Sequence, residues 1–205
     1  MGIVAADISM SLDGYIAGPN DTLEQGLGER GERLHEWVYE LAAWRSRHGL
    51  PGGTTGSINE QMDEAYKNTG ATIIGRRMFD IAEGPWGDEP PFHMPVFVVT
   101  HRARGPLAKQ GDTTFYFVTD GIDSALAQAR AAAGEKNVGV GGGASVIQQF
   151  LARGLLDELH IHLVPVLLGG GRRLFEPDSP PYMEFEITRV AQSPGAIHLS
   201  FQPTR

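Results

Sequence analysis

Apolar positions along the chain follow two kinds of repeat, which predict strands alternating with helices. Short apolar runs bounded by turn residues predict strands at residues 2–11, 71–74, 96–100, 115–118, 138–140 and 159–168. Helices are predicted, from apolar residues at i, i+3, i+4 and i+7 in the first of them, at 33–47, 122–133 and 144–156. Ser57 and Glu60 form a capping box that predicts a further helix, which Gly70 ends.

The last part of the chain alternates apolar and polar residues in two segments, 183–190 and 196–202, which predicts an antiparallel hairpin. The order of elements indicates a three-layer α/β fold, in which helices cover both faces of a mixed, mostly parallel sheet. We expect a single domain over residues 1–205, with a helical insert at about 33–70 and a long loop at 84–95.

Composition limits the classes of function. A net charge of −8 argues against nucleic acid as the main partner, because nucleic-acid phosphates bind basic surfaces. The chain has no cysteine, which excludes disulfides, thiolate metal sites and cysteine nucleophiles. No stretch reaches the roughly 18 apolar residues of a membrane span. We therefore expect a cytoplasmic protein that acts on a small molecule.

The sequence GVGGGA at 139–144 is the most informative motif. It follows a predicted strand, begins a predicted helix and satisfies the pattern G-x-G-x-x-A. Consecutive glycines let a ligand approach the backbone, and the N-terminus of the next helix favours an anion such as phosphate. Asp157 and Glu158 precede their strand instead of ending it, which argues against a Rossmann domain. A nucleotide cofactor is the first hypothesis, and a tight turn that packs a helix against a sheet is the alternative.

Basic residues follow two other predicted strands. Arg76 and Arg77 stand at a strand-to-helix turn, where they are either solvated charges or a fork for phosphate. Thr100, His101 and Arg102 end a strand with a hydroxyl, an imidazole and a guanidinium group, which together suit an extra phosphate. Both patterns fit the nucleotide hypothesis, although each is weak alone.

Two further groups of polar residues leave their interpretation open. Asp13 precedes a glycine in a turn signal and either bonds its own backbone or faces a substrate. His160 and His162 alternate with apolar residues and so share one face of a strand. Because no third ligand accompanies them, we predict an ordinary strand face and no metal site.

These motifs together resemble the dihydrofolate reductase-like superfamily, in particular the reductase domain of riboflavin biosynthesis and the stand-alone bacterial proteins related to it. The matching segments are spread in order over nearly the whole chain, at 9–17, 75–79, 98–102, 141–145, 157–159 and 165–175. The chain lacks the zinc deaminase segment of the two-domain riboflavin enzyme. It also lacks the proline-tryptophan pair of housekeeping dihydrofolate reductases, so the resemblance is more specific for the fold than for the substrate.

The resemblance implies a mixed sheet of about eight or nine strands, with NADPH across the carboxyl ends of the central strands. The segments at 75–77 and 141–145 would contact the cofactor phosphates. His101 or Arg102 would lie near the adenosine 2′-phosphate, and the loop 12–17 would border the nicotinamide and the substrate. Relatives pair through sheet edges or C-terminal strands, so a homodimer is expected. The implied cofactor-binding residues are Ala17, Gly75, Arg76, Arg77, Met78, Thr100, His101, Arg102, Gly141, Gly142, Gly143, Ala144, Ser145 and Val146.

Three functions are compatible with these observations. The leading hypothesis is an NADPH-dependent reductase of a small planar heterocycle, such as a pterin or pyrimidine derivative, or of a carbonyl compound. In that reaction the proton would come from Asp13, from a helix carboxylate such as Glu36, or from water. The alternative is a non-catalytic NADPH-binding or redox-sensor module of the same fold. A third hypothesis is an enzyme that uses a nucleotide sugar or a methyl donor at the same glycine turn.

Overall fold

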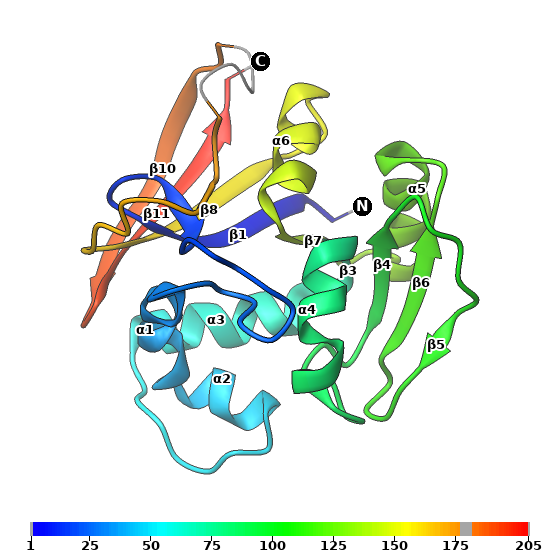
Figure 1. Ribbon diagram of the computed structural model, residues 1–205, viewed down its shortest axis with the longest axis horizontal. Helices are drawn as coiled ribbons and strands as arrows, with labels where there is room; N and C mark the ends of the chain where they lie inside the picture. Colours follow the sequence, from blue (N-terminus) through cyan, green and yellow to red (C-terminus); the bar gives the residue numbers. More distant parts are fainter. Residues whose placement is uncertain (1, 177–181, 205) are drawn as a thin grey trace.

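A computed structural model describes residues 2–176 and 182–204. The described chain forms a nine-stranded sheet in the order β10-β11-β8-β1-β7-β3-β4-β6-β5 (Figure 1). Neighbouring strands in its central part are parallel, and the carboxyl ends of these strands therefore meet at one edge of the sheet. They are β8 (Glu158–Val164), β1 (Val4–Ser11), β7 (Asn137–Gly142), β3 (Thr69–Gly75), β4 (Pro95–Val99) and β6 (Thr114–Val118).

Antiparallel strands complete both sides of this parallel part. The hairpin of β10 (Phe185–Ser193) and β11 (Ala196–Pro203) extends the sheet beside β8, and β5 (Leu107–Ala108) borders β6. A separate ladder joins β2 (Tyr15–Ala17) to β9 (Arg172–Arg173). The predicted α/β class, mostly parallel sheet and C-terminal hairpin are confirmed.

Helices lie on both faces of the sheet, as Figure 1 shows. One face carries α5 (Ile122–Ala133) and α6 (Ala144–Ala152), and the largest group of buried apolar side chains fills the space beneath them. The other face carries α4 (Arg76–Trp86) and a helical segment, defined here as residues 31–68, over two smaller apolar clusters. That segment contains η1 (Gly31–Leu34), α1 (Glu36–Tyr39), α2 (Ala42–Arg47) and α3 (Ser57–Asn68). Within the described ranges no helix combines the length and apolar character that a membrane span requires.

The prediction of a single helix at 33–47 is wrong, because the chain turns within this range. η1, α1 and α2 replace it, and Leu41 adopts an extended conformation between the last two. The carbonyl of Glu40 accepts hydrogen bonds from the backbone N–H and from the hydroxyl of Thr54, at 2.6 and 3.0 Å. A contact with a distant residue thus overrides the helical periodicity.

The prediction of a capping box at Ser57 and Glu60 is also wrong. Gly56 occupies the N-cap position with a φ of 125°, no side chain caps the helix, and Ser57 is its first residue. Gly70 does not end the helix but lies inside β3, because Thr69 already pairs with β7. Tertiary pairing therefore ends this helix before its glycine signal.

The other predicted boundaries differ less from those in the structure. The helix predicted at 122–133 matches α5, whereas the helix predicted at 144–156 ends at Ala152. The loop predicted at 84–95 begins only after Trp86, where α4 ends. The Trp86 ring packs against Phe92 and Phe115, with centroids 4.8 and 5.8 Å away, and this packing holds the last turn of α4 in place.

Gly70 lets β3 approach the C-terminal end of α5. A Cβ at Gly70 would lie 2.9 Å from both Cα and the carbonyl oxygen of Ala133, which are backbone atoms that cannot move aside cheaply. We predict that Gly70→Ala lowers the free energy of unfolding by about 1–3 kcal/mol through overpacking. Urea denaturation measures the change, with Gly105→Ala as the control, because a Cβ there would meet no described atom within 4 Å. Equal stabilities of the two variants would contradict the close approach.

Candidate functional site

The glycine turn leads from β7 into α6 at the centre of the parallel edge. Gly142 has a φ of 106°, and Gly143 is the N-cap residue of α6. A Cβ on Gly75 would lie 3.1 Å from Cγ2 of Val146, so the starts of α4 and α6 are close neighbours. A Cβ on Gly143 would meet no described atom within 4 Å, so the backbone is open on that side. An open helix N-terminus of this kind favours an anion.

A cluster of arginines extends from the start of α4 to the end of β4. The Asp80 carboxylate accepts one hydrogen bond from Arg76 and another from Arg102, both at 2.7 Å. The Arg102 side chain is 68% exposed, and its backbone N–H donates to the Thr100 hydroxyl at 3.0 Å. His101 is exposed between them. Two guanidinium groups against one carboxylate leave a net positive charge, which suits a phosphate group.

Arg77 has a different partner from Arg76. Its guanidinium donates to the Asp21 carboxylate at 2.6 Å and to the Asp21 carbonyl at 2.9 Å, and Arg172 donates to the same carboxylate. Burial raises the pKa of Asp21, but the hydrogen bonds from Arg172 and Arg77 outweigh it and hold the pKa below its usual value. Asp21 therefore fastens the loop after β2 to the start of α4. The phosphate contact expected of Arg77 stays a prediction.

Asp13 fastens a second pair of loops. Its carboxylate accepts hydrogen bonds from the Ser11 hydroxyl at 2.6 Å and from the N–H groups of Leu168 and Gly169 at 3.1 and 2.7 Å. Desolvation raises the pKa of Asp13, but the combined effect of these hydrogen bonds is larger and lowers the pKa below its usual value. The carboxylate is therefore ionised at neutral pH. Ala17 lies buried in β2, at the end of the same loop. These contacts favour a structural role for Asp13, and its role as a proton donor stays a prediction.

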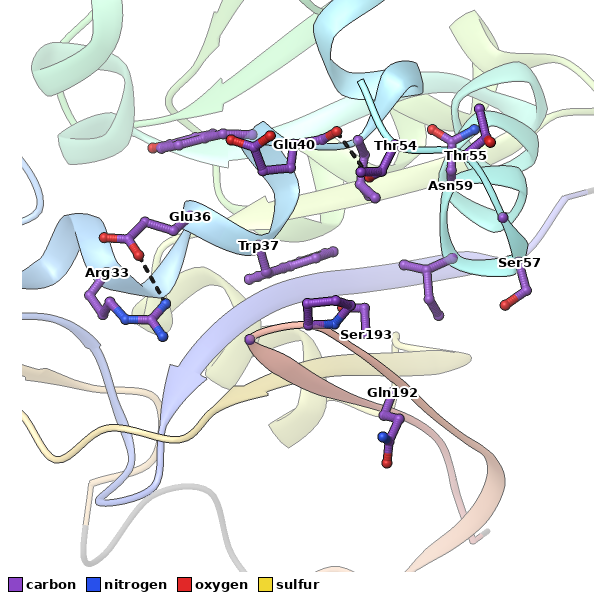
Figure 2. A pocket seen from close by; sticks show the side chains of 16 residues that line it. Arg33, Glu36, Trp37, Glu40, Thr54, Thr55, Ser57, Asn59, Gln192 and Ser193 are labelled. Carbon is purple, nitrogen blue, oxygen red and sulfur yellow. Dashed lines mark hydrogen bonds and ion pairs between the residues drawn. The ribbon is translucent and has the colours of Figure 1, made fainter. Parts of the chain in front are cut away.

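Glu36 lines a groove of about 860 Å³ between the helical segment and the tip of the β10–β11 hairpin. Figure 2 shows Arg33 and Glu36 at one end of this groove and Ser57 and Asn59 at the other. The Glu36 carboxylate forms an ion pair with Arg33 at 3.1 Å. No residue of the glycine turn lines the groove. The structure therefore does not bring Glu36 together with the candidate cofactor site, and its role as a proton donor also stays a prediction.

Asp7 is a candidate functional residue that the sequence analysis missed. It lies in β1, and its Oδ1 is 2.9 Å from Nε2 of His162. The side chain is 56% exposed although β1 has a strand on each side. The neighbouring strand β7 carries Gly139 and Gly141 here, and glycines leave space beside the carboxylate. Because the Asp7 charge interacts with His162 in β8 and with Tyr66 in α3, we infer that its carboxylate faces the space between the sheet and the helical segment, which is named here the Asp7 recess.

Side chains from both helical elements on this face border the recess. A Cβ on Gly141 would lie 3.3 Å from Cγ2 of Ile74 and 3.9 Å from Cε of Met78, so α4 closes one side. Desolvation by the surrounding protein raises the pKa of Asp7, but the charge and the hydrogen bond of His162 lower it more, and the carboxylate is ionised at neutral pH. Burial and then the charge of Asp7 raise the pKa of Tyr66, on α3, to about 12. The recess thus combines a carboxylate, an imidazole and a neutral phenol.

Each histidine of β8 has a hydrogen-bond partner in a neighbouring strand. His160 Nδ1 lies 2.9 Å from the Ser200 hydroxyl, and His162 Nδ1 lies 2.7 Å from Nδ1 of His198. Across residues 2–176 and 182–204, no group of three or more acidic or imidazole side chains is placed to hold a metal ion.

Comparison with known proteins places the chain in a family. Residues 3–199 match the family described as RibD C-terminal domain. The chain belongs to this family. RibD C-terminal domains are the reductase domain of riboflavin biosynthesis, so the resemblance inferred from the motifs is confirmed. A search of curated proteins gives no match.

Solved structures similar to this chain share its fold. A protein assigned to riboflavin biosynthesis from Shewanella sp. PV-4 is 22% identical, with a TM-score of 0.69 and 99% coverage of both chains. Dihydrofolate reductase from Enterococcus faecalis, complexed with NADP(H), is 14% identical with a TM-score of 0.56, and the alignment covers 100% of this chain and 98% of that one. A deaminase/5-amino-6-(5-phosphoribosylamino)uracil reductase from Thermotoga maritima is 15% identical with a TM-score of 0.61. The alignment covers 99% of this chain but only 57% of that longer protein.

The Asp21 contacts predict a dependence of stability on pH. Because the folded state lowers the pKa of Asp21 below 3.8, the stabilisation is present above that value and is lost as pH falls through the folded-state pKa. The Asp21 side chain is 14% exposed, but Arg77 and Arg172 are 44% and 49% exposed, so solvent screening reduces the effect. We expect Asp21→Asn to cost about 1 kcal/mol at pH 7 and less at pH 3.

Denaturation of this variant at both pH values measures the difference. Asp120→Asn is the control, because Asp120 is exposed. A penalty for Asp21→Asn that is the same at pH 3 and pH 7 would contradict the ionic clamp.

Proposed function

We propose that this protein is an NADPH-dependent reductase of a small planar heterocycle, such as a pterin or a pyrimidine derivative, or of a small carbonyl compound. The observation that carries the proposal is the junction of two helix starts, where Gly75 before α4 approaches Gly143 before α6. Two helix N-termini at one point suit the linked phosphates of a dinucleotide. The open backbone at Gly143 gives a phosphate room to approach.

The arginine cluster supports NADPH as the cofactor in preference to NADH. Arg76 and Arg102 share the single carboxylate of Asp80, next to the helix starts, so an additional phosphate would find unneutralised positive charge there. The Enterococcus faecalis dihydrofolate reductase, whose fold this chain shares, is described as a complex with NADP(H). We therefore propose that this cluster binds the 2′-phosphate that distinguishes NADPH from NADH.

The recess at Asp7 is the proposed substrate side. Bound NADPH supplies a hydride, and the protein must hold the acceptor and supply a proton. Asp7 is the carboxylate that faces open space next to the glycine strand, and His162 holds it by a hydrogen bond. Asp13 and Glu36 have other contacts, so we propose Asp7 as the group that transfers the proton. The names of the two reductase relatives, which refer to folate and uracil compounds, support a flat heterocycle as the acceptor.

A homodimer is part of the proposal. The hairpin at the end of the sheet exposes three large apolar side chains, since Ile187 is 60%, Val190 63% and Ile197 44% exposed. A second copy of the chain would cover them.

Replacement of Arg102 tests the cofactor. We predict that Arg102→Ala weakens NADPH binding about 10-fold to 100-fold, because a charged hydrogen bond to phosphate is worth about 1.5–3 kcal/mol, and leaves NADH binding unchanged. Fluorescence titration of the nicotinamide measures both affinities. Arg153→Ala is a matched control, because it removes an arginine whose ion pair, with Asp123, lies on the other face of the sheet. Equal weakening of NADPH and NADH would contradict the assignment, and a wild-type protein that binds neither would refute the function.

Replacement of Asp7 tests the substrate side. We predict that Asp7→Asn retains NADPH affinity and lowers the rate of NADPH oxidation about 100-fold, because positioned proton transfer contributes about that much. The rate is measured with a panel of pterins, pyrimidines and small carbonyl compounds. Asp13→Asn serves as the comparison, since we expect it to weaken the contact between the two loops and to lower stability more than turnover. Loss of turnover in Asp13→Asn with normal turnover in Asp7→Asn would reverse the two roles. Tight NADPH binding without oxidation by any acceptor would favour the non-catalytic sensor.

A further inference from the structure

A hydrogen-bonded chain of side chains leads away from Asp7 across the sheet. Nε2 of His162 lies 2.9 Å from Asp7, and Nδ1 of His162 lies 2.7 Å from Nδ1 of His198. Nε2 of His198 lies 2.8 Å from the Ser193 hydroxyl. His162 and His198 are 8% and 7% exposed. Because these residues belong to the neighbouring strands β1, β8, β11 and β10, the register of the sheet fixes the chain in place.

Trp37 covers the two imidazole rings. Its ring centroid lies 4.3 Å from that of His162 and 4.7 Å from that of His198, and its Nε1 donates to the Ser9 hydroxyl at 3.1 Å. Trp37 and Ser193 both line the groove in Figure 2. The imidazoles are thus enclosed, while the Asp7 end of the chain opens on the recess.

The hydrogen-bonded chain has two states that differ by one proton. In the loaded state His162 is cationic, and it donates from Nε2 to the ionised carboxylate of Asp7 and from Nδ1 to Nδ1 of His198. Nε2 of neutral His198 then donates to the Ser193 hydroxyl. In the spent state His162 has lost the proton of Nε2 and keeps the proton of Nδ1, so its contact with His198 is unchanged.

The extra proton is not on His198. Burial, and then the charge of His162, lower the pKa of His198 to about 4, so His198 is neutral at physiological pH. Nε2 of His162 lies 2.9 Å from the Asp7 carboxylate, whereas Nε2 of His198 meets the neutral Ser193 hydroxyl.

We propose that His162 stores the proton that Asp7 delivers to the substrate, and that His198 and Ser193 are positioning residues that keep an acceptor nitrogen directed at His162. This inference rests on the proposed reductase function. In the step, the Nε2–H bond of His162 breaks and the proton passes to Asp7. Asp7 gives it to the acceptor, which also receives the hydride. Asp7 afterwards takes a proton from an acid in solvent, such as hydronium or a buffer acid, and passes it to the vacant Nε2 of His162, so the hydrogen-bonded chain regains its loaded state.

The surrounding charges belong to several packed elements. Asp7 and His198 also face titratable or charged groups other than His162, which contribute to any dependence on pH. These groups are His160 on β8, Arg189 on β10, His35 before α1 and Tyr66 on α3.

Two replacements of His198 separate proton storage from packing. A glutamine keeps an oxygen acceptor for His162, whereas a leucine fills similar space without one. We expect single-turnover NADPH oxidation to fall about tenfold or more in His198→Leu and to stay within about threefold of wild type in His198→Gln. Without the acceptor the cationic form of His162 is less stable, so the activity of His198→Leu should be lost at a lower pH than that of the wild type. NADPH affinity should be unchanged in both.

Serine variants provide the matched control. Ser193→Ala removes the hydroxyl that holds the tautomer of His198 and should lower the rate several-fold, with its pH profile shifted in the same direction as that of His198→Leu. Ser200→Ala removes a similar contact between a serine and a histidine, His160, which is not part of the hydrogen-bonded chain from Asp7 to Ser193. We expect this variant to leave the rate unchanged. Equal rates and unshifted profiles for His198→Leu and His198→Gln would overturn the proposal.

Nitrogen-15 NMR of the imidazoles tests the stored proton without turnover. We expect His162 to be protonated on both nitrogens within the active pH range, and His198 on Nε2 alone. A His162 that is neutral throughout that range would overturn storage even if the enzyme reduces its substrate. Failure of the wild type to oxidise NADPH with any acceptor would refute the reductase itself, and the two failures are therefore distinguishable.

Discussion

The lack of side chains on one face of β7 is the constraint on which the site depends. β7 lies between β1 and β3, and its glycines at 139 and 141 project nothing over the face that carries α4 and the helical segment. Space therefore remains beside Asp7, which would otherwise be covered. At the end of the same strand, Gly142 and Gly143 carry the chain into α6 with an open backbone. The candidate phosphate site and the recess are thus two consequences of one strand, and they lie next to each other for that reason.

Carboxylates hold the loops around this edge. Asp13 binds the backbone of the segment after β8, and Asp21 binds arginines from α4 and β9. Each joins segments that are more than 50 residues apart in the sequence, where short loops offer few apolar contacts. A ligand at the carboxyl edge would consequently meet loops that are already ordered, which reduces the entropy that binding must overcome. Asp80 differs from both, because its two arginines leave positive charge for a ligand.

Asp7 is not among the residues that line the groove, although both lie on the same face of the sheet. Trp37 covers His162 and His198 and also lines the groove. A polar chain buried beneath an aromatic ring is costly unless every member is paired, and here each nitrogen of both imidazoles has a partner. The network therefore fixes the two rings and, through them, the position of the Asp7 carboxylate.

The sequence by itself determined the strand and helix order, the C-terminal hairpin, the glycine turn and the family resemblance, because these depend on local periodicity and on residues adjacent in the chain. It could not place Asp7, which looks like an isolated acid in an apolar strand until the register sets it beside His162 and the glycines of β7. Nor could it foresee the break at Leu41, which a hydrogen bond from Thr54 to the preceding carbonyl imposes. Only the tertiary structure decided which carboxylates hold loops and which one faces open space, because that choice depends on contacts between segments far apart in the chain.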